Sequence, residues 1–177
     1  MRSNQTGISL IESLVALLVL ALGVLGLLGV QLRTAVESRT GTHRMQAARL
    51  AEDLSERVKS NPLGVAAIAQ YAVGWGAAPA APVNCTTGTC TGAQAAAFDL
   101  VRWKSSVTNT LPSGVATSFV SGTDARQLGV MIGWAANEAN PTGSADYVAP
   151  FNVNVNAGGV SVNCPAGLIC HLVYAQP

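Results

Sequence analysis

The stretch that decides the fold is GISLIESLVALLVLALGVLGLLGV, residues 7–30, near the N-terminus of a chain of 177 residues. From Ile8 to Val30 the stretch holds a single charged side chain, Glu12, and no proline. As a helix it would span about 35 Å, enough to cross a hydrocarbon core of about 30 Å. A domain this small could hardly cover such a helix on all sides. We therefore expect a membrane-spanning or helix-packing segment rather than a buried core helix.

The segment differs from an ordinary signal peptide, in which a shorter apolar region precedes a small-residue cleavage site. Here the apolar run is followed by Gln31, Leu32 and Arg33 and then by a helical pattern. Its one carboxylate is also unusual, because a charge inside a membrane helix costs free energy and is a functional candidate by default. Glu12 either reaches the lipid headgroups or has a specific role.

The residues around Glu12 favour a specific role. GISLIE, residues 7–12, resembles the processing motif of type IV prepilins, in which a polar leader ends in glycine before an apolar run whose fifth residue is glutamate. The resemblance implies that a prepilin peptidase cuts between Gly7 and Ile8 and methylates the new N-terminus at Ile8. In the family, the first residue of the mature chain is usually Phe or Met, so Ile8 departs from the pattern. A buried carboxylate needs a partner, and the resemblance implies that Glu12 pairs with the N-terminal amine of a neighbouring subunit during assembly.

Beyond residue 30 the helical pattern continues and becomes amphipathic. Apolar side chains recur on one helical face at Ala47, Leu50, Ala51, Leu54 and Val58. Charged pairs at favourable helical spacing are Asp53–Arg57 and Glu56–Lys59. Pro62 predicts the helix end near residue 60, because the residue before a proline is pushed out of the helical region. Residues 8–60 hold six basic and five acidic side chains, too balanced to attract phosphates, so we expect no nucleic-acid partner.

Residues 61–177 are the predicted globular part, with three basic and four acidic side chains. We expect a long loop over residues 71–97 and a short helix over 98–110. Strands are predicted at 115–120, 127–135, 151–156 and 168–174. A long helix followed by several strands predicts an α+β fold, with an antiparallel sheet packed on the helix. Trp103 and Trp134 are expected to be core aromatics.

Three further stretches resemble the PilV-type minor pilins: ARLAEDLSER at residues 48–57, DLVRW at 99–103 leading to LPSG at 111–114, and VMIGW at 130–134. The resemblance is strong over residues 1–60, moderate over 98–135 and weak elsewhere. It implies a type IV pilin-like fold in four parts. These are a leader peptide (1–7), a transmembrane and filament-core helix (8–30), its amphipathic continuation (31–60) and a globular pilin head domain (61–177).

The chain has four cysteines, in two closely spaced pairs: Cys85 with Cys90 and Cys164 with Cys170. Four cysteines allow three connectivities. In an exported protein we favour the two local disulfides, although long-range pairing stays open, and disulfides indicate an oxidising compartment. A zinc site would need closer spacing, and no catalytic constellation surrounds either histidine. We expect no metal, no cofactor and no enzymatic activity.

The leading hypothesis is a minor pilin of a type IV pilus, acting in priming and assembly or at the filament tip. The resemblance implies roles in twitching motility and surface adhesion, with other minor pilins, the major pilin and a tip adhesin as partners. Before assembly the protein would sit in the inner membrane with its head in the periplasm, and afterwards in the pilus at the cell surface. One alternative is a pseudopilin of a type II secretion system. Another, from a different class, is an uncleaved single-span anchored binding protein.

Overall fold

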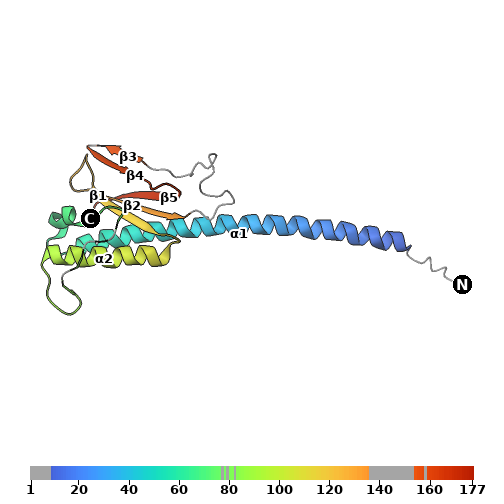
Figure 1. Ribbon diagram of the computed structural model, residues 1–177, viewed down its shortest axis with the longest axis horizontal. Coiled ribbons are helices and arrows are strands. Elements are labelled where there is room, and N and C mark those ends of the chain that lie inside the picture. Colours follow the sequence, from blue (N-terminus) through green and yellow to red (C-terminus); the bar gives the residue numbers. More distant parts are fainter. Residues whose placement is uncertain (1–8, 77, 79, 82, 136–153, 158) are drawn as a thin grey trace. The chain divides into compact units, whose positions relative to one another are not determined.

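The computed structural model describes residues 9–76, 78, 80–81, 83–135, 154–157 and 159–177. The chain divides into two compact units, Met1–Arg39 and Thr40–Pro177. Helix α1, Leu10–Ser60, contributes residues to both units (Figure 1). It ends where the sequence predicts, because Pro62 disfavours the helical conformation at Asn61.

The second unit contains all the remaining elements. They are a 3₁₀ helix η1 (Gly64–Tyr71), helix α2 (Gly92–Thr110), and strands β1 (Val115–Val120), β2 (Leu128–Ala135), β3 (Asn154–Ala157), β4 (Val160–Asn163) and β5 (Leu168–Ala175). Strands β1, β2 and β5 form an antiparallel sheet in the order β1-β2-β5, and β3 pairs with β4 in a separate hairpin. In the sheet, Val130 of β2 lies opposite Ser118 of β1 and Val173 of β5.

Both faces of the central strand β2 are buried. Successive side chains of a strand point to opposite faces, so its two sets of residues enter two different clusters. Val130, Ile132 and Trp134 pack with apolar residues of α1 and α2 in the larger cluster. Met131 belongs to a smaller cluster with residues of β3, β4 and β5. The sheet is therefore covered by helices on one face and by the β3–β4 hairpin on the other, as Figure 1 shows.

The structure confirms the expected α+β architecture, in which the helix packs on an antiparallel sheet. On the predicted apolar face, Ala47, Ala51, Leu54 and Val58 are buried, and Leu50 is partly buried. Strand β1 has its predicted bounds, and β2 and β5 differ from theirs by one residue each.

The expectation of a long loop over residues 71–97 is wrong at its C-terminal end. Helix α2 begins at Gly92, well before the predicted residue 98, because Thr91 and Gln94 form a capping box. The Thr91 hydroxyl accepts from Gln94 N at 3.4 Å, and Gln94 Oε1 accepts from Thr91 N at 2.9 Å. Each side chain thus satisfies a backbone N–H that the helix leaves free.

Two other elements were not predicted. Helix η1 begins at Gly64, whose φ of 53° lies in the left-handed region that favours glycine, and it turns the chain directly after α1. Strand β4 was also not predicted, although its four residues alternate between apolar and polar. The strand expected at 151–156 is found as β3, and residues 151–153 lie outside the described residues.

Candidate functional site

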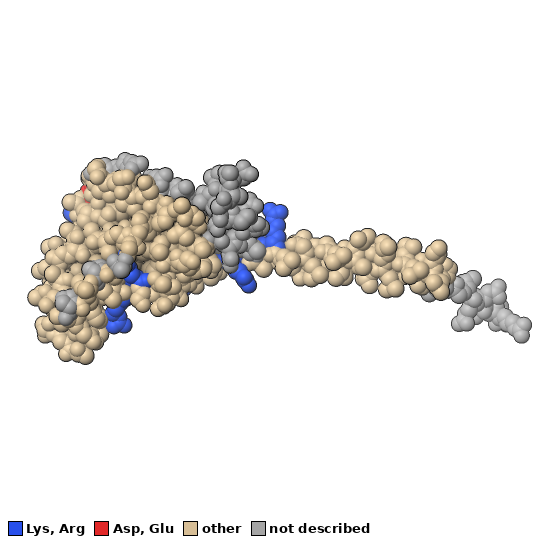
Figure 2. All heavy atoms as spheres, viewed as in Figure 1, with Lys and Arg blue, Asp and Glu red and all other residues tan. Residues whose placement is uncertain are grey.

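The apolar part of α1 carries the strongest functional signal. Among the described residues, Leu10–Ala35 is the one helical segment long and apolar enough to cross a membrane, with a mean hydropathy of 2.7. Its side chains are exposed throughout. Figure 2 shows the N-terminal part of α1 as tan on the visible face, up to the first basic side chain. Large apolar side chains exposed in series need a lipid or protein surface to cover them.

Glu12 lies in the first turn of this helix. Its backbone N–H donates to the carbonyl oxygen of Ser9 at 3.0 Å, which places the carboxylate at the positive end of the helix dipole. Its neighbours Leu10 and Ile11 are 81% and 72% exposed. Glu12 is thus an acidic group on an otherwise apolar surface, where it can contact a cation of another molecule. The predicted cleavage and methylation residues, Gly7 and Ile8, lie outside the described residues.

A buried polar cluster joins the end of α1 to η1 and α2, and its centre is the Tyr71 hydroxyl. This hydroxyl lies 2.8 Å from Asp99 Oδ2 and 3.2 Å from the carbonyl oxygen of Arg57. It also accepts a hydrogen bond from Asn61 Nδ2 at 3.1 Å. Burial raises the pKa of Tyr71, and the neighbouring Asp99 raises it further. The hydroxyl therefore stays protonated, and its hydrogen bonds link η1 to α1 and α2.

Arg57 extends the cluster along α1. Its guanidinium donates to Asp53 at 2.9 Å and to Asp99 at 3.3 Å. The sequence predicted the Asp53–Arg57 pair from its helical spacing, and the structure confirms it, together with the Glu56–Lys59 pair at 2.8 Å. Nothing in the sequence pointed to Asp99 as the second partner, because it lies 42 positions further along the chain.

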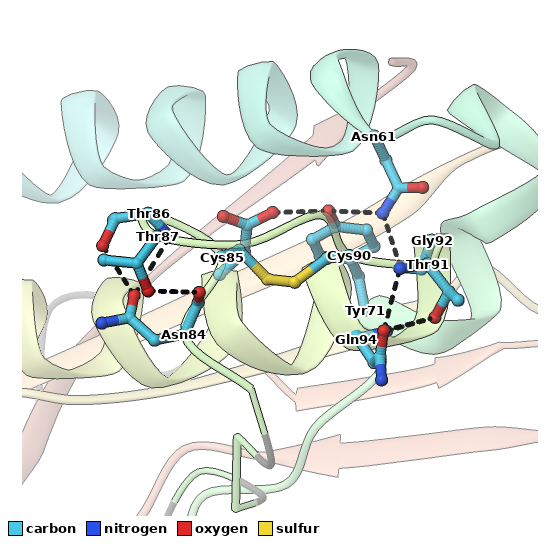
Figure 3. The surroundings of a disulfide bond; sticks show 11 residues. Asn61, Tyr71, Asn84, Cys85, Thr86, Thr87, Cys90, Thr91, Gly92 and Gln94 are labelled. Carbon is cyan, nitrogen blue, oxygen red and sulfur yellow. Dashed lines mark hydrogen bonds between the residues drawn. A yellow bond between two sulfur atoms is a disulfide. The ribbon is translucent and has the colours of Figure 1, made fainter.

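The four cysteines form two disulfides, Cys85–Cys90 and Cys164–Cys170. These are the two local pairs that their spacing favoured. Cys85–Cys90 closes the loop just before α2, and Figure 3 shows it beside the capping box at the start of that helix. Cys164–Cys170 ties the end of β4 to β5, and Cys170 is completely buried in the smaller cluster.

Trp103 and Trp134 are both core residues, as predicted, with exposed fractions of 0% and 1%. Trp103 Nε1 donates to the carbonyl oxygen of Leu50 at 2.7 Å and so ties α2 to α1. Trp134 Nε1 has no hydrogen-bond partner in the part of the chain that the structure describes. Within that part, no group of three or more His, Cys, Asp or Glu side chains is placed to hold a metal ion.

Two family models match the chain. Residues 2–28 match the prokaryotic N-terminal methylation motif, and residues 29–101 match the family of type IV pilin Tt1218. No curated protein and no solved structure matches it. The first match covers the predicted processing residues and Glu12, and the second runs from the apolar part of α1 into α2. The chain is therefore type IV pilin-like, with a prepilin methylation motif.

Proposed function

We propose that the protein is a minor pilin of a type IV pilus, similar to the PilV-type subunits. It is made as a prepilin, anchored in the inner membrane through residues 8–30, and enters the filament after its leader of residues 1–7 is removed. The observation that carries the proposal is the exposed apolar helix Leu10–Ala35, most of which lies within the match to the methylation motif over residues 2–28.

The exposed helix requires a partner on physical grounds. Each large apolar side chain removed from water contributes about 1.5–3 kcal/mol, so the segment is stable only in lipid or against other helices. A membrane supplies the first environment before assembly. A bundle of the same helices from other subunits, the major pilin and other minor pilins, supplies the second.

In this proposal Glu12 fixes the register, which is the position of each helix along its neighbours in the bundle. Cleavage after Gly7 leaves an amine at Ile8, about one helical turn from Glu12. In a bundle that excludes water, a carboxylate is tolerated only with a charged or hydrogen-bonded partner. The amine of a neighbouring subunit is that partner, so a helix shifted by one turn would leave both charges buried and unpaired.

The second unit, which carries the predicted head domain 61–177, fits a periplasmic and then an extracellular location. Its two disulfides belong to an oxidising compartment. Within the pilus, we assign the protein a role in the priming of assembly or at the filament tip beside an adhesin. We also assign it roles in twitching motility and adhesion.

Processing tests the proposal at its first step. The full-length protein is expressed with and without a prepilin peptidase, beside a Gly7→Leu variant that removes the glycine before the cut. Intact mass should show loss of residues 1–7 and one added methyl group only when the peptidase is present and Gly7 is retained. An uncut chain in the presence of an active peptidase would instead favour an uncleaved membrane-anchored binding protein.

A further inference from the structure

A cavity of about 310 Å³ opens on the second unit between α2, the start of β1 and the segment around Trp75. Its lining includes Trp75, Ser105, Thr108 and one charged residue, Lys104. Its volume is at the lower end of the range of small-molecule sites, about 300–1,000 Å³, which suits a ligand of monosaccharide size.

Lys104 is a buried cation without an acidic partner in the described part of the chain. The residue is 9% exposed, and its ammonium donates to the carbonyl oxygens of Gly74 and Gly76. Burial lowers the pKa of Lys104, and no carboxylate offsets this effect. Two neutral carbonyls use two of the three N–H donors, which leaves one donor and an uncompensated charge beside the cavity.

The other walls add shape and hydrogen-bonding groups. The Trp75 indole is held in place, because its Nε1 donates to the carbonyl oxygen of Asn163 at 3.1 Å. Thr108 is oriented by its contacts to the carbonyl oxygens of Lys104 and Gly114, at 3.1 and 3.3 Å. A fixed aromatic ring, hydroxyl groups and a single cation are the combination that positions a small polar ring carrying one negative charge.

We propose that this cavity binds a sugar acid, with the ligand carboxylate on the Lys104 ammonium and the sugar ring against Trp75. The carboxylate would supply the charge that Lys104 lacks, and a charge-assisted hydrogen bond is stronger than the carbonyl contacts alone. The residues that line this site all belong to the second unit.

Binding of glucuronate to the full-length protein in detergent tests the proposal, measured by calorimetry and ligand-observed NMR. Glucuronamide is the matched probe, because it keeps the ring and removes the charge. We expect glucuronate to bind about tenfold more tightly than glucuronamide, the difference expected of one hydrogen bond to a charged group. Equal binding of the two probes, or no binding of glucuronate, would overturn the proposal.

Two variants assign the binding to the cavity. Lys104→Gln should weaken glucuronate binding by about tenfold. Arg102→Gln, which removes an exposed cation outside the cavity on the same helix, should leave binding unchanged. Because Lys104 also holds Gly74 and Gly76, Ser105→Tyr serves as a second variant that fills the cavity from its exposed rim and keeps the lysine. Unchanged binding in Ser105→Tyr would place the ligand elsewhere.

Succinate separates sugar recognition from simple attraction of a carboxylate. It carries carboxylates without a sugar ring, so it should bind more weakly than glucuronate. Succinate binding as tight as that of glucuronate would contradict the role given to Trp75 and to the two hydroxyls.

Discussion

At the level of single residues, we expect Tyr71 to contribute more to the stability of the second unit than its position in a short 3₁₀ helix suggests. Its hydroxyl contacts the Arg57 carbonyl of α1, the Asp99 carboxylate of α2 and the Asn61 side chain between α1 and η1. The residue has no exposed surface. Removing the hydroxyl would leave the buried Asn61 amide and the partly buried Arg57 carbonyl and Asp99 carboxylate each short of a partner, which costs more than the loss of an exposed hydrogen bond.

We therefore expect Tyr71→Phe to lower the free energy of unfolding by about 1–3 kcal/mol. Tyr174→Phe is the matched control, because Tyr174 is 41% exposed and its ring packs edge-on against Phe119. Its effect should stay within about 0.5 kcal/mol. Urea unfolding of the full-length protein in detergent measures both values, and equal effects would mean that the Tyr71 cluster contributes no stability of its own.

Glu12 acts in assembly under the proposed function, so its removal should spare the earlier steps. Glu12→Gln keeps the size of the side chain and removes its charge. We expect normal membrane insertion and leader cleavage, but about tenfold less protein in sheared filaments, the effect expected from loss of a charged hydrogen bond. Ser13→Ala, a polar change at the next position of the same helix, should leave the filament fraction unchanged. A normal filament fraction for Glu12→Gln would refute the register role.

His171 gives the second unit a dependence on pH. Burial lowers its pKa, and the charge of Arg44 lowers it further. The unfolded chain therefore binds this proton more tightly than the folded chain. The stability that neutral His171 contributes is present above about pH 6.5 and is lost as the pH falls from there through the lowered pKa.

His171→Gln should remove this part of the pH dependence. Urea midpoints measured between about pH 7 and pH 5 should fall less steeply in the variant than in the wild-type protein. Identical slopes would show that folding does not lower the pKa of His171.

At the level of elements, the two disulfides occupy different environments. Each closes a short loop and should contribute about 2 kcal/mol by restricting the unfolded chain. Cys170 is also fully buried among apolar side chains between the sheet and the β3–β4 hairpin, whereas Cys85 and Cys90 lie in a partly exposed loop. The Cys164–Cys170 bond thus holds the β3–β4 hairpin on the sheet as well as closing a loop.

We expect Cys164→Ala/Cys170→Ala to lose more stability than Cys85→Ala/Cys90→Ala, by about 1 kcal/mol or more, because the first pair leaves a cavity in packed surroundings. Urea unfolding of the two double variants gives the comparison. A larger loss for the Cys85–Cys90 pair would mean that the loop before α2, rather than the hairpin, limits the stability of this unit.

The sequence predicted the elements whose signals are local. Helix α1 follows from an uninterrupted apolar and then amphipathic pattern that stops before Pro62, and β1, β2 and β5 follow from β-rich runs between turns. Helix α2 was predicted too short because its start depends on the side chains of Thr91 and Gln94, in a stretch rich in Gly, Ala and Pro.

Functional residues, too, could be predicted only where their signal is local in the sequence. Glu12 and the processing residues could be predicted because one short motif contains them all. The Tyr71 cluster and the Lys104 cavity were missed, because the residues that form them lie between 10 and 42 positions apart and meet only in the folded chain. No periodicity or spacing in the sequence signals such a contact.

At the level of the whole molecule, the two units have opposite surface chemistry. The first exposes a continuous series of Leu, Val and Ile side chains along α1. The second buries its apolar residues on both faces of a three-stranded sheet and is closed by two disulfides. This division is what a filament subunit requires, since one unit must be covered by other molecules and the other must be stable when it is not.

The most direct test of the filament proposal is the intact mass of the protein recovered from sheared filaments, measured beside that of the membrane fraction. We predict that the filament form begins at a methylated Ile8 and retains every residue to Pro177, with both disulfides formed. A chain that still begins at Met1 and is confined to the membrane fraction would contradict a role in the filament.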